Sequence, residues 1–377
     1  MSTFAGALSA RAMDPVLPQV AADLAVTIQV AATLASAFAV TFALLQPVLG
    51  ALADVVGKPK LIFFCLILLG VSNIAGAFST SFDMLLVTRA LSGIGGGGVM
   101  PVTLGLVGDL FPIRERQVAL GRILSGAMAG NLLGASLSGF IGDFVGWRGV
   151  LIAIGVLVIA ASVAVGWGFR DQMRTPRRQT NFKALLQNYR AIFAHPHARV
   201  CYIGVFVEGS CLLGLFPFVA AFLAQLGEPR PWIAGLIMAG FPVGGLVYTT
   251  SVSRLLPWLG EKGLMIGGGA LMASQLVVIA FGPPWPVQLA SFVVMGCGFY
   301  MIHGSLQTFA SEISIEARGT AVAMHAFCFF LGQTAGPIAY GFGILNAGKV
   351  ATLLAAAALM LALGFVCARL LQHEHAA

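Results

Sequence analysis

Apolar stretches about 17–25 residues long recur along this chain, and each ends in a short polar or Gly/Pro-containing turn. A stretch of that length crosses the hydrocarbon core of a bilayer as an α-helix, because a helix satisfies its own backbone hydrogen bonds. We therefore expect an all-α polytopic membrane protein of about twelve transmembrane helices. The expected helices cover residues 2–18, 27–50, 61–79, 84–108, 118–142, 148–169, 199–225, 232–256, 263–281, 287–311, 319–343 and 349–370.

The composition agrees with a surface that faces lipid. Only 9% of the 377 residues are charged and 58% are hydrophobic, whereas a soluble domain carries about 25% charged residues. The cysteines form neither a CxxC pair nor a metal-ligand spacing, so we expect neither disulfides nor a bound metal. They fall inside apolar runs, at Cys65, Cys201, Cys211, Cys297, Cys328 and Cys367.

Lysine and arginine gather in alternate connections of the expected helices, and this asymmetry predicts the orientation. One side carries only Arg148, Arg230 and Lys349. The other side is then cytoplasmic and holds both termini. The net charge of +7 is thus a topology signal, and we expect no nucleic-acid partner. The basic residues on the cytoplasmic side are Lys58, Lys60, Arg114, Arg116, Arg122, Arg170, Arg174, Arg177, Arg178, Lys183, Arg190, Arg199, Arg254, Lys262, Arg318 and Arg369.

The first apolar stretch is interrupted by Arg11, Asp14 and Pro15, so it lacks the continuous apolar core of a cleavable signal peptide. It is also short for a membrane span. Two explanations stay open at this point. Either the natural start of the chain lies upstream, or the first helix is tilted or thinned at its cytoplasmic end.

Residues 170–198 form a long polar segment between two groups of six expected helices. The second part of this segment follows helical spacing, after Thr180 or Asn181 as the N-cap. We expect it to lie along the cytoplasmic face and to link two halves, residues 1–169 and 199–377. A disordered linker is the alternative. The apolar positions of the expected helix are Phe182, Leu185, Leu186, Tyr189, Ile192 and Phe193.

The two halves repeat weakly at an offset of 202 residues, the separation of Arg116 from Arg318. A constant offset at both ends of a half favours two pseudo-symmetric six-helix halves. Such a repeat places the substrate cavity between the halves, near the bilayer midplane, and implies that one half rocks against the other. The aligned positions also include Pro15 with Pro217, Gly130 with Gly332, and Gly134 with Gly336.

The turn after the second expected helix reads Gly50-Ala-Leu-Ala-Asp54-Val-Val-Gly57-Lys58-Pro-Lys. This sequence resembles motif A of the major facilitator superfamily, a family of secondary transporters with the twelve-helix fold. The glycines permit close packing and a tight turn. Two positions depart from the motif, because Val55 stands where a basic residue is usual and Pro59 stands where a second one is.

The resemblance implies a gate at this turn. Asp54 is expected to face the positive N-terminal end of the helix that begins near 318–320, which closes the cytoplasmic side. Lys58 is expected to pair with Asp109 at the end of the fourth expected helix. Because of the two departures from the motif, we expect this latch to be weaker than the family's usual one.

Two further helices carry glycine patterns similar to family motifs. The fourth resembles motif B, and the fifth resembles the motif C of drug–proton antiporters, although Asn131 stands where that motif has proline. Small residues at every fourth position let two helices approach closely. The positions that carry these patterns are Arg89, Gly93 and Gly97 in the fourth helix, Gly130 and Gly134 in the fifth, and Gly336 with Pro337 in the pseudo-equivalent eleventh.

Charged residues inside the first and fourth expected helices are candidates for proton coupling. Arg11 and Asp14 share one face of the first helix at i, i+3 spacing, and Arg89 lies at a similar depth. We expect an Asp14–Arg89 or Asp14–Arg11 pair facing the cavity, since a buried charge needs a partner. Drug-exporting members of the family, which this chain resembles, place a titratable acid and an arginine there. A static ion pair that orients the helices is the alternative.

Glu208 lies near the middle of the seventh expected helix with no basic residue close to it in sequence. A carboxylate there is either protonated or functional, so Glu208 is a candidate site for a proton or a cationic substrate. His303 and His325 are weaker candidates, because a lone histidine in a membrane more often bonds two helices together. Possible polar contacts to a substrate come from Asn131, Tyr300, Gln307 and Gln333.

The chain has no Walker, zincin or nucleophile-elbow motif, so we expect neither an enzyme nor a cofactor. The resemblance implies a monomeric secondary transporter in a bacterial inner membrane, which exchanges protons for amphipathic, drug-like compounds by alternating access. A sugar or amino-acid exporter and a proton symporter stay open, as does a non-transporting receptor or assembly factor. A membrane-embedded enzyme would need clustered acids and histidines at one membrane face, and the sequence has no such cluster.

Overall fold

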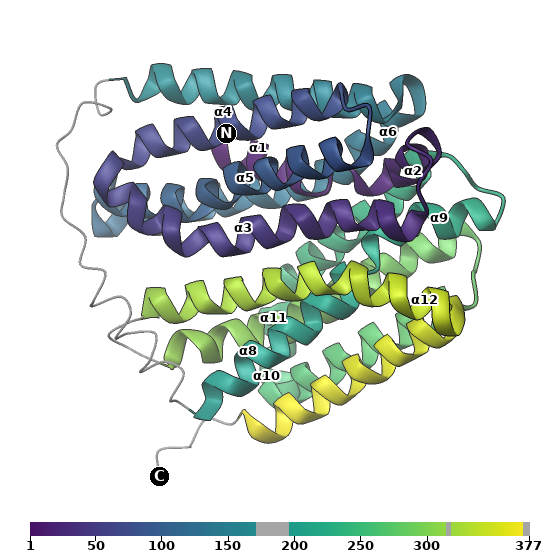
Figure 1. Ribbon diagram of the computed structural model, residues 1–377. Coiled ribbons are helices and arrows are strands. Elements are labelled where there is room, and N and C mark those ends of the chain that lie inside the picture. The colour runs from purple at the N-terminus through teal and green to yellow at the C-terminus, as the bar shows by residue number, and fades with distance from the viewer. Residues whose placement is uncertain (171–195, 314–317, 372–377) are drawn as a thin grey trace, which may run out of the picture. The chain divides into compact units, whose positions relative to one another are not determined.

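The computed structural model describes residues 1–170, 196–313 and 318–371, and every regular element in these ranges is a helix (Figure 1). Eight of these helices are long and apolar enough to cross a membrane. The predicted all-α class is therefore confirmed. The amphipathic helix expected at 182–193 lies outside the described residues.

The chain divides into two compact units, which we describe separately. Unit 1 comprises Met1–Thr180 and Phe216–Ala239, and unit 2 comprises Asn181–Leu215 and Gly240–Ala377. Helix α10 (Pro231–Ala280) begins in unit 1 and continues in unit 2. The other elements of unit 1 are α1 (Ser2–Ala10), η1 (Asp14–Val16), α2 (Leu17–Asp23), α3 (Ile28–Val56), α4 (Lys58–Ala77), α5 (Phe82–Leu110), α6 (Ile113–Gly168) and α9 (Phe216–Gln225). Those of unit 2 are α8 (Pro196–Glu208), η3 (Gly209–Leu213), α11 (Trp285–Glu312) and α12 (Arg318–Leu370).

The three longest helices each contain one sharp corner at a glycine. The backbone φ is +71° at Gly146 in α6, +64° at Gly260 in α10 and +83° at Gly348 in α12. Glycine adopts this left-handed region without the steric cost that a side chain would add. Each corner falls in a gap between two expected helices, so α6, α10 and α12 are each a pair of spans.

The first and seventh expected helices are not continuous, and in this respect the sequence-based expectation is wrong. The helix expected at 2–18 ends at Ala10, and a 3-10 turn follows at Asp14–Val16. Pro15 explains the break, because proline has no N–H to donate and disfavours α geometry in the residue before it. The helix expected at 199–225 is broken by the π-helical turn η3 and resumes at α9.

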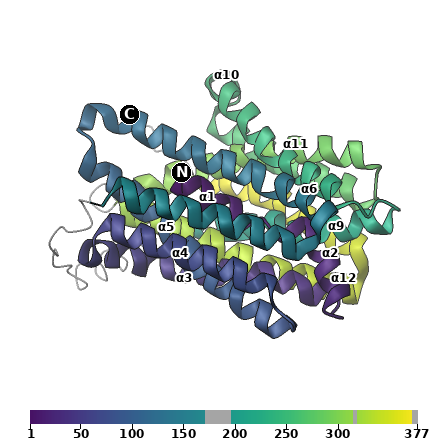
Figure 2. The ribbon, with the colours of Figure 1, turned by 90° about the horizontal axis from the view of Figure 1, so that it is seen from above.

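Unit 1 is a bundle in which α5 packs against both α3 and α4 (Figure 1), and Figure 2 shows the same helices from above. Polar caps start two of these helices, since the Thr27 and Ser81 hydroxyls accept hydrogen bonds from backbone N–H groups at the first turns of α3 and α5. α6 packs against both α4 and α1. The bundle thereby surrounds the break in the first helix.

In unit 2, α12 packs along both α8 and η3, and α11 packs against α8. Close approach depends on small residues here, because a Cβ at Gly336 would lie 2.7 Å from the Cα of Gly214. In unit 1, α6 and α1 approach each other similarly closely, because a Cβ at Gly134 would lie 2.7 Å from the carbonyl oxygen of Leu8. In each unit, a glycine-rich helix thus packs closely beside the broken one.

Candidate functional site

The break in the first helix of unit 1 holds a buried ion pair. Arg11 donates from a terminal guanidinium nitrogen to the Asp14 carboxylate at 3.3 Å. Arg11 is 9% exposed and Asp14 is 2% exposed. The Arg11 guanidinium also lies over the ring of Phe216, 4.9 Å from its centre. Of the two expected pairings of Asp14, the structure therefore forms the one with Arg11.

Arg89 lies in the interior of the same unit, on α5, and is 2% exposed. Its guanidinium donates a long hydrogen bond to the side-chain oxygen of Asn73, at 3.4 Å, and lies over the ring of Phe38 at 4.6 Å. Asn73 in turn donates to the Ser9 hydroxyl at 2.7 Å. The Nε of Arg89 finds no acceptor among the described residues. This buried cation is therefore only partly satisfied.

Unit 2 holds a different buried group at its own break. Glu208, the last residue of α8 before the π-turn, is completely buried. One of its carboxyl oxygens lies 2.8 Å from Nδ1 of His303 on α11. The other oxygen has no hydrogen-bond partner among the described residues. The sequence offered Glu208 no local partner, and the fold supplies one that is 95 residues away.

Aromatic rings enclose this carboxyl–imidazole pair. The ring of His303 stacks on Phe299 with centres 4.8 Å apart, and it meets the ring of Phe329 at 5.1 Å. The ring of His325 lies 5.0 Å from that of His303, edge to face. Two imidazoles beside one carboxyl group can accept and pass a proton. No group of three metal-binding side chains occurs among the described residues.

The other expected polar contacts are scattered rather than gathered at this pair. Gln333 is buried on α12, and Tyr300 packs its ring against Phe299 with centres 5.2 Å apart. Gln307 and Asn131 are exposed within their own units. The structure therefore brings Glu208, His303 and His325 together and leaves the rest of that predicted set apart.

The predicted gate residues lie at one end of unit 1. Lys58 extends from the start of α4 to the Asp109 carboxylate at 2.6 Å, and it also donates to the Gly105 carbonyl at 3.3 Å. Gly57 occupies the corner before it with φ of +98°. Gly50 and Asp54 fall within α3. The Asp54 side chain and its expected contact near 318–320 lie outside the described part of the chain.

The motif B and motif C glycines lie where helices come close. A Cβ at Gly97 would meet the Phe42 carbonyl oxygen at 2.7 Å, and one at Gly93 would clash with Phe38 and Thr41. A Cβ at Gly130 would likewise clash with the backbone carbonyl of Phe4. Pro337 lies inside α12, directly after the glycine that packs against η3.

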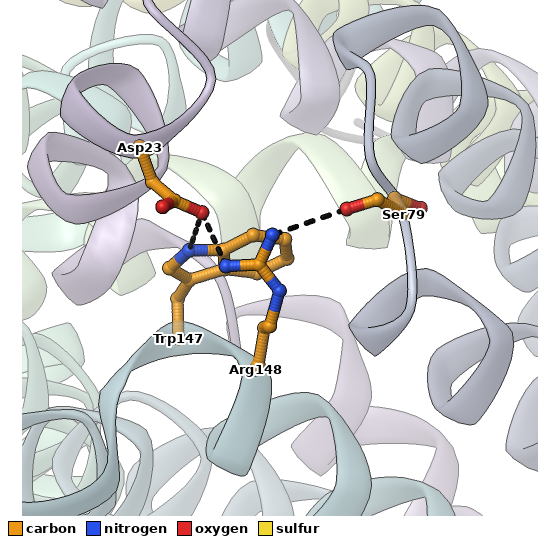
Figure 3. A network of polar contacts seen from close by, with 4 residues as sticks. All are labelled: Asp23, Ser79, Trp147 and Arg148. Carbon is orange, nitrogen blue, oxygen red and sulfur yellow. Dashed lines mark hydrogen bonds and ion pairs between the residues drawn. The ribbon is translucent and has the colours of Figure 1, made fainter.

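A polar network at the opposite end of unit 1 joins three connections between helices (Figure 3). Arg148 donates to the Asp23 carboxylate and to the Ser79 carbonyl, the latter at 3.2 Å. The indole N–H of Trp147 donates to the same Asp23 oxygen at 3.2 Å, and the guanidinium lies over the indole at 4.2 Å. The hydrogen bond from Arg148, with help from Trp147, lowers the pKa of Asp23. Here one arginine joins the end of α2, the turn between α4 and α5, and the corner of α6.

Comparison with known proteins identifies the family. Residues 1–337 match the profile described as Major Facilitator Superfamily. The chain belongs to the major facilitator superfamily. Membership makes this protein a membrane transporter rather than an enzyme, and the predicted fold of the family is confirmed.

The curated relatives are named for drug resistance, and the solved structures show the fold. The chain is 24% identical to "Multidrug resistance protein 1" of Bacillus subtilis (strain 168) and 26% identical to "Quinolone resistance protein NorA" of Staphylococcus aureus (strain MSSA476). Each alignment covers 87% of this chain and 84% of the relative. Among structures of the superfamily fold, a bacterial homolog of the human lysosomal transporter Spinster has a TM-score of 0.77 at 17% identity, covering 98% of this chain and 95% of its own. A D-xylose–proton symporter has a TM-score of 0.73 at 16% identity, with the same coverage.

Sequence reasoning about this transporter missed two sets of partners. Asn73, which accepts from Arg89, is an ordinary polar residue in an apolar helix, and only its intramembrane position marks it. The Asp23 partner of Arg148 is 125 residues away, so no local pattern joins them. The Gly146-Trp147-Arg148 sequence could have indicated this network. The glycine forms the corner of α6, and the two residues that follow it both donate to Asp23.

Proposed function

We propose that this transporter is a proton-coupled carrier that exports small amphipathic, drug-like compounds by alternating access. The observation that carries the proposal is the buried pair of Glu208 and His303, 2.8 Å apart in the C-terminal half. The relatives named for multidrug and quinolone resistance support export of such compounds. The bacterial relatives support a plasma-membrane location for the carrier.

A proton is the natural ligand of this pair. An ionised carboxylate buried alone in a membrane interior is costly, so Glu208 must hold a proton or face a protonated imidazole. The pair therefore titrates as one unit that carries one proton or two. A change of access from one side of the membrane to the other would let this unit load on one side and release on the other. Rocking of the two halves, residues 1–169 and 199–377, supplies that change in our proposal.

Asp14 is the second candidate carboxylate, and its surroundings give it a different role. Its carboxylate accepts a hydrogen bond from Arg11 at 3.3 Å, so a counter-charge lies within the same break. Glu208 instead faces an imidazole, which is a counter-charge only when it is protonated. We therefore assign proton carriage to Glu208 and His303, and keep the Asp14 cluster for holding the first helix and for contact with substrate.

Substrate-evoked proton movement in proteoliposomes tests the proposal. The internal pH would be followed with a trapped dye while quinolones and lipophilic cations are added under imposed pH gradients. The wild-type protein is expected to move protons against the direction of the compound, and Glu208→Gln and His303→Gln are expected to abolish this flux. The matched control is Glu228→Gln, because Glu228 pairs with Arg230 outside the candidate spans. Full proton flux in Glu208→Gln would overturn the assignment.

The same assay separates export from the alternative of proton symport. The solved D-xylose–proton symporter shares this fold, and the fold by itself does not select a direction. In antiport the compound and the proton move in opposite directions, so adding compound on one side acidifies that side. In symport the same addition makes that side more alkaline. An alkaline shift with a sugar or amino acid, together with silence for amphipathic compounds, would replace export with uptake.

A further inference from the structure

The two members of the Glu208–His303 pair differ in their access to the surroundings. The Glu208 side chain is 0% exposed, whereas the His303 side chain is 18% exposed. Among the described residues, Glu208 makes its side-chain hydrogen bond to His303, and its second oxygen is buried without a partner. The imidazole ring therefore stands between the carboxyl group and the open space that borders the site.

The two nitrogens of the His303 ring lie in different environments. Nδ1 is 2.8 Å from Oε2 of Glu208. Nε2 has no hydrogen-bond partner among the described residues and, unlike Nε2 of His325, it is not completely buried. An imidazole can bind a proton at one nitrogen and release one from the other, because both nitrogens of the cation carry hydrogen. The ring thus has one end at the carboxyl group and the other end open.

The neighbouring titratable groups do not offer a second route. The ring of His325 on α12 lies 5.0 Å from that of His303, but His325 is 1% exposed and its Nε2 is buried without a partner in the described structure. Tyr300 and Cys367 lie close enough to Glu208 to interact with its charge. A phenol and a thiol hold their own protons at neutral pH, so neither accepts one from Glu208.

We propose that Glu208 stores the transported proton and that His303 is its route in and out. A proton binds at Nε2 and makes the ring an imidazolium. The Nδ1–H bond then breaks as an O–H bond forms at Oε2 of Glu208, and the ring is neutral again with its proton on Nε2. Release follows the same steps in reverse. The inference rests on the proposed transport function and names the proton path within it.

This route has a spectroscopic signature in the wild-type protein. The neutral His303 ring is expected to carry its proton on Nδ1 when Glu208 is ionised and on Nε2 when Glu208 is protonated. Nitrogen NMR of the full-length protein in lipid bilayers, with isotope-labelled histidine, distinguishes these two tautomers. The infrared carboxyl band of Glu208 reports its protonation, and spectra of Glu208→Gln and His303→Gln assign the signals. A ring that kept one tautomer in both states would overturn the proposal without any functional assay of a variant.

The rate of proton exchange gives a second test. After a rapid change of pH, the carboxyl band of Glu208 is expected to change at least about tenfold more slowly in His303→Gln than in wild type, and to reach the same final size. The amide still bonds to Glu208 but cannot pass a proton from one end to the other. The matched control is His197→Gln, since His197 packs against Phe309 with ring centres 6.2 Å apart, and its rate is expected to stay at the wild-type value.

Two kinetic results would contradict this route. A wild-type rate in a folded His303→Gln would show that the proton reaches Glu208 without the ring. Slow exchange in His325→Gln, with a normal rate in His303→Gln, would move the route to the other imidazole.

Failure of the route and failure of proton coupling are distinguishable. If a quinolone leaves the Glu208 band of the wild-type protein unchanged, proton coupling at this pair fails and the route fails with it. If the quinolone removes the proton from Glu208 while His303 keeps one tautomer, the route alone fails and the coupling stands.

Discussion

Each unit contains one broken helix, but the two breaks hold different charged and titratable side chains. In unit 1 the break lies at Asp14–Val16, and in unit 2 it lies at the π-turn Gly209–Leu213. Unit 1 places an arginine–aspartate pair there, whereas unit 2 places Glu208 beside His303. A broken helix therefore occurs in both units, but the geometry of the break and its charges differ.

The offset of 202 residues makes the contrast specific. At this offset Asp14 corresponds to Phe216 and Arg89 to Ser291, while Glu208 corresponds to Gly6 and His303 to Pro101. None of the four charged or titratable groups thus has a counterpart of its own kind. One unit thus buries an arginine–aspartate centre, and the other buries a carboxyl–imidazole centre.

The largest effect is expected from Glu208→Gln. We expect substrate-evoked proton flux to fall to the background of protein-free liposomes, while the thermal unfolding temperature stays within a few degrees of wild type. The amide keeps the shape of the side chain and removes the proton site, and one carboxyl oxygen has no partner to lose. A variant that lost stability along with flux would make the C-terminal centre structural and would break the comparison.

Asp14→Asn is expected to give the opposite pattern. Removing the carboxylate leaves two buried guanidiniums with no counter-charge, and breaking a buried ion pair costs about 3–5 kcal/mol. We expect a clear loss of thermal stability in detergent, measured beside Glu208→Gln as the matched carboxylate-to-amide change. If Asp14→Asn were as stable as wild type and lacked only proton flux, the N-terminal centre would be the coupling site.

The Arg148 network is expected to show a moderate effect that depends on pH. Arg148 lowers the pKa of Asp23 in the folded state, so the ionised carboxylate stabilises the fold. This contribution is present above the unfolded pKa of about 3.9 and is lost as the pH falls through the lower folded value. We expect Asp23→Asn to lower the unfolding temperature by a few degrees at pH 7, and the difference from wild type to vanish in acid. A difference that persisted unchanged below the folded pKa would assign the effect to packing alone.

The smallest effect is expected at the Lys58–Asp109 pair. Asp109 is 59% exposed on its side chain, so water and salt screen the attraction to Lys58. A double-mutant cycle of Lys58→Met and Asp109→Asn is expected to give a coupling below about 1 kcal/mol that decreases in high salt. A coupling several times larger would show that this pair holds unit 1 together as firmly as the buried pair does.

The sequence predicts the general architecture because lipid imposes strong local rules. Span lengths and glycine corners such as Gly146 follow from apolar length and turn chemistry, and Lys58 meets Asp109 as the motif A resemblance implied. The breaks at Asp14–Val16 and Gly209–Leu213 were missed. Arg11, Asp14 and Pro15 interrupt the first apolar stretch, but its length still suggested one helix, and the apolar run continues through Gly209–Leu213. The pairing of Glu208 with His303 was beyond reach because it depends on how α8 and α11 pack, which no local pattern records.

The contacts of Arg148 determine where spectroscopic labels should be placed to measure motion in this transporter. One side chain on the corner of α6 links the C-terminal end of α2 to the turn between α4 and α5 (Figure 3). Spectroscopic labels attached to these three places would report the same displacement three times over. A second label should therefore be placed at the Lys58 end of the helices. There, among the described residues, Lys58 bonds Gly105 and Asp109, which are not part of the Arg148 network.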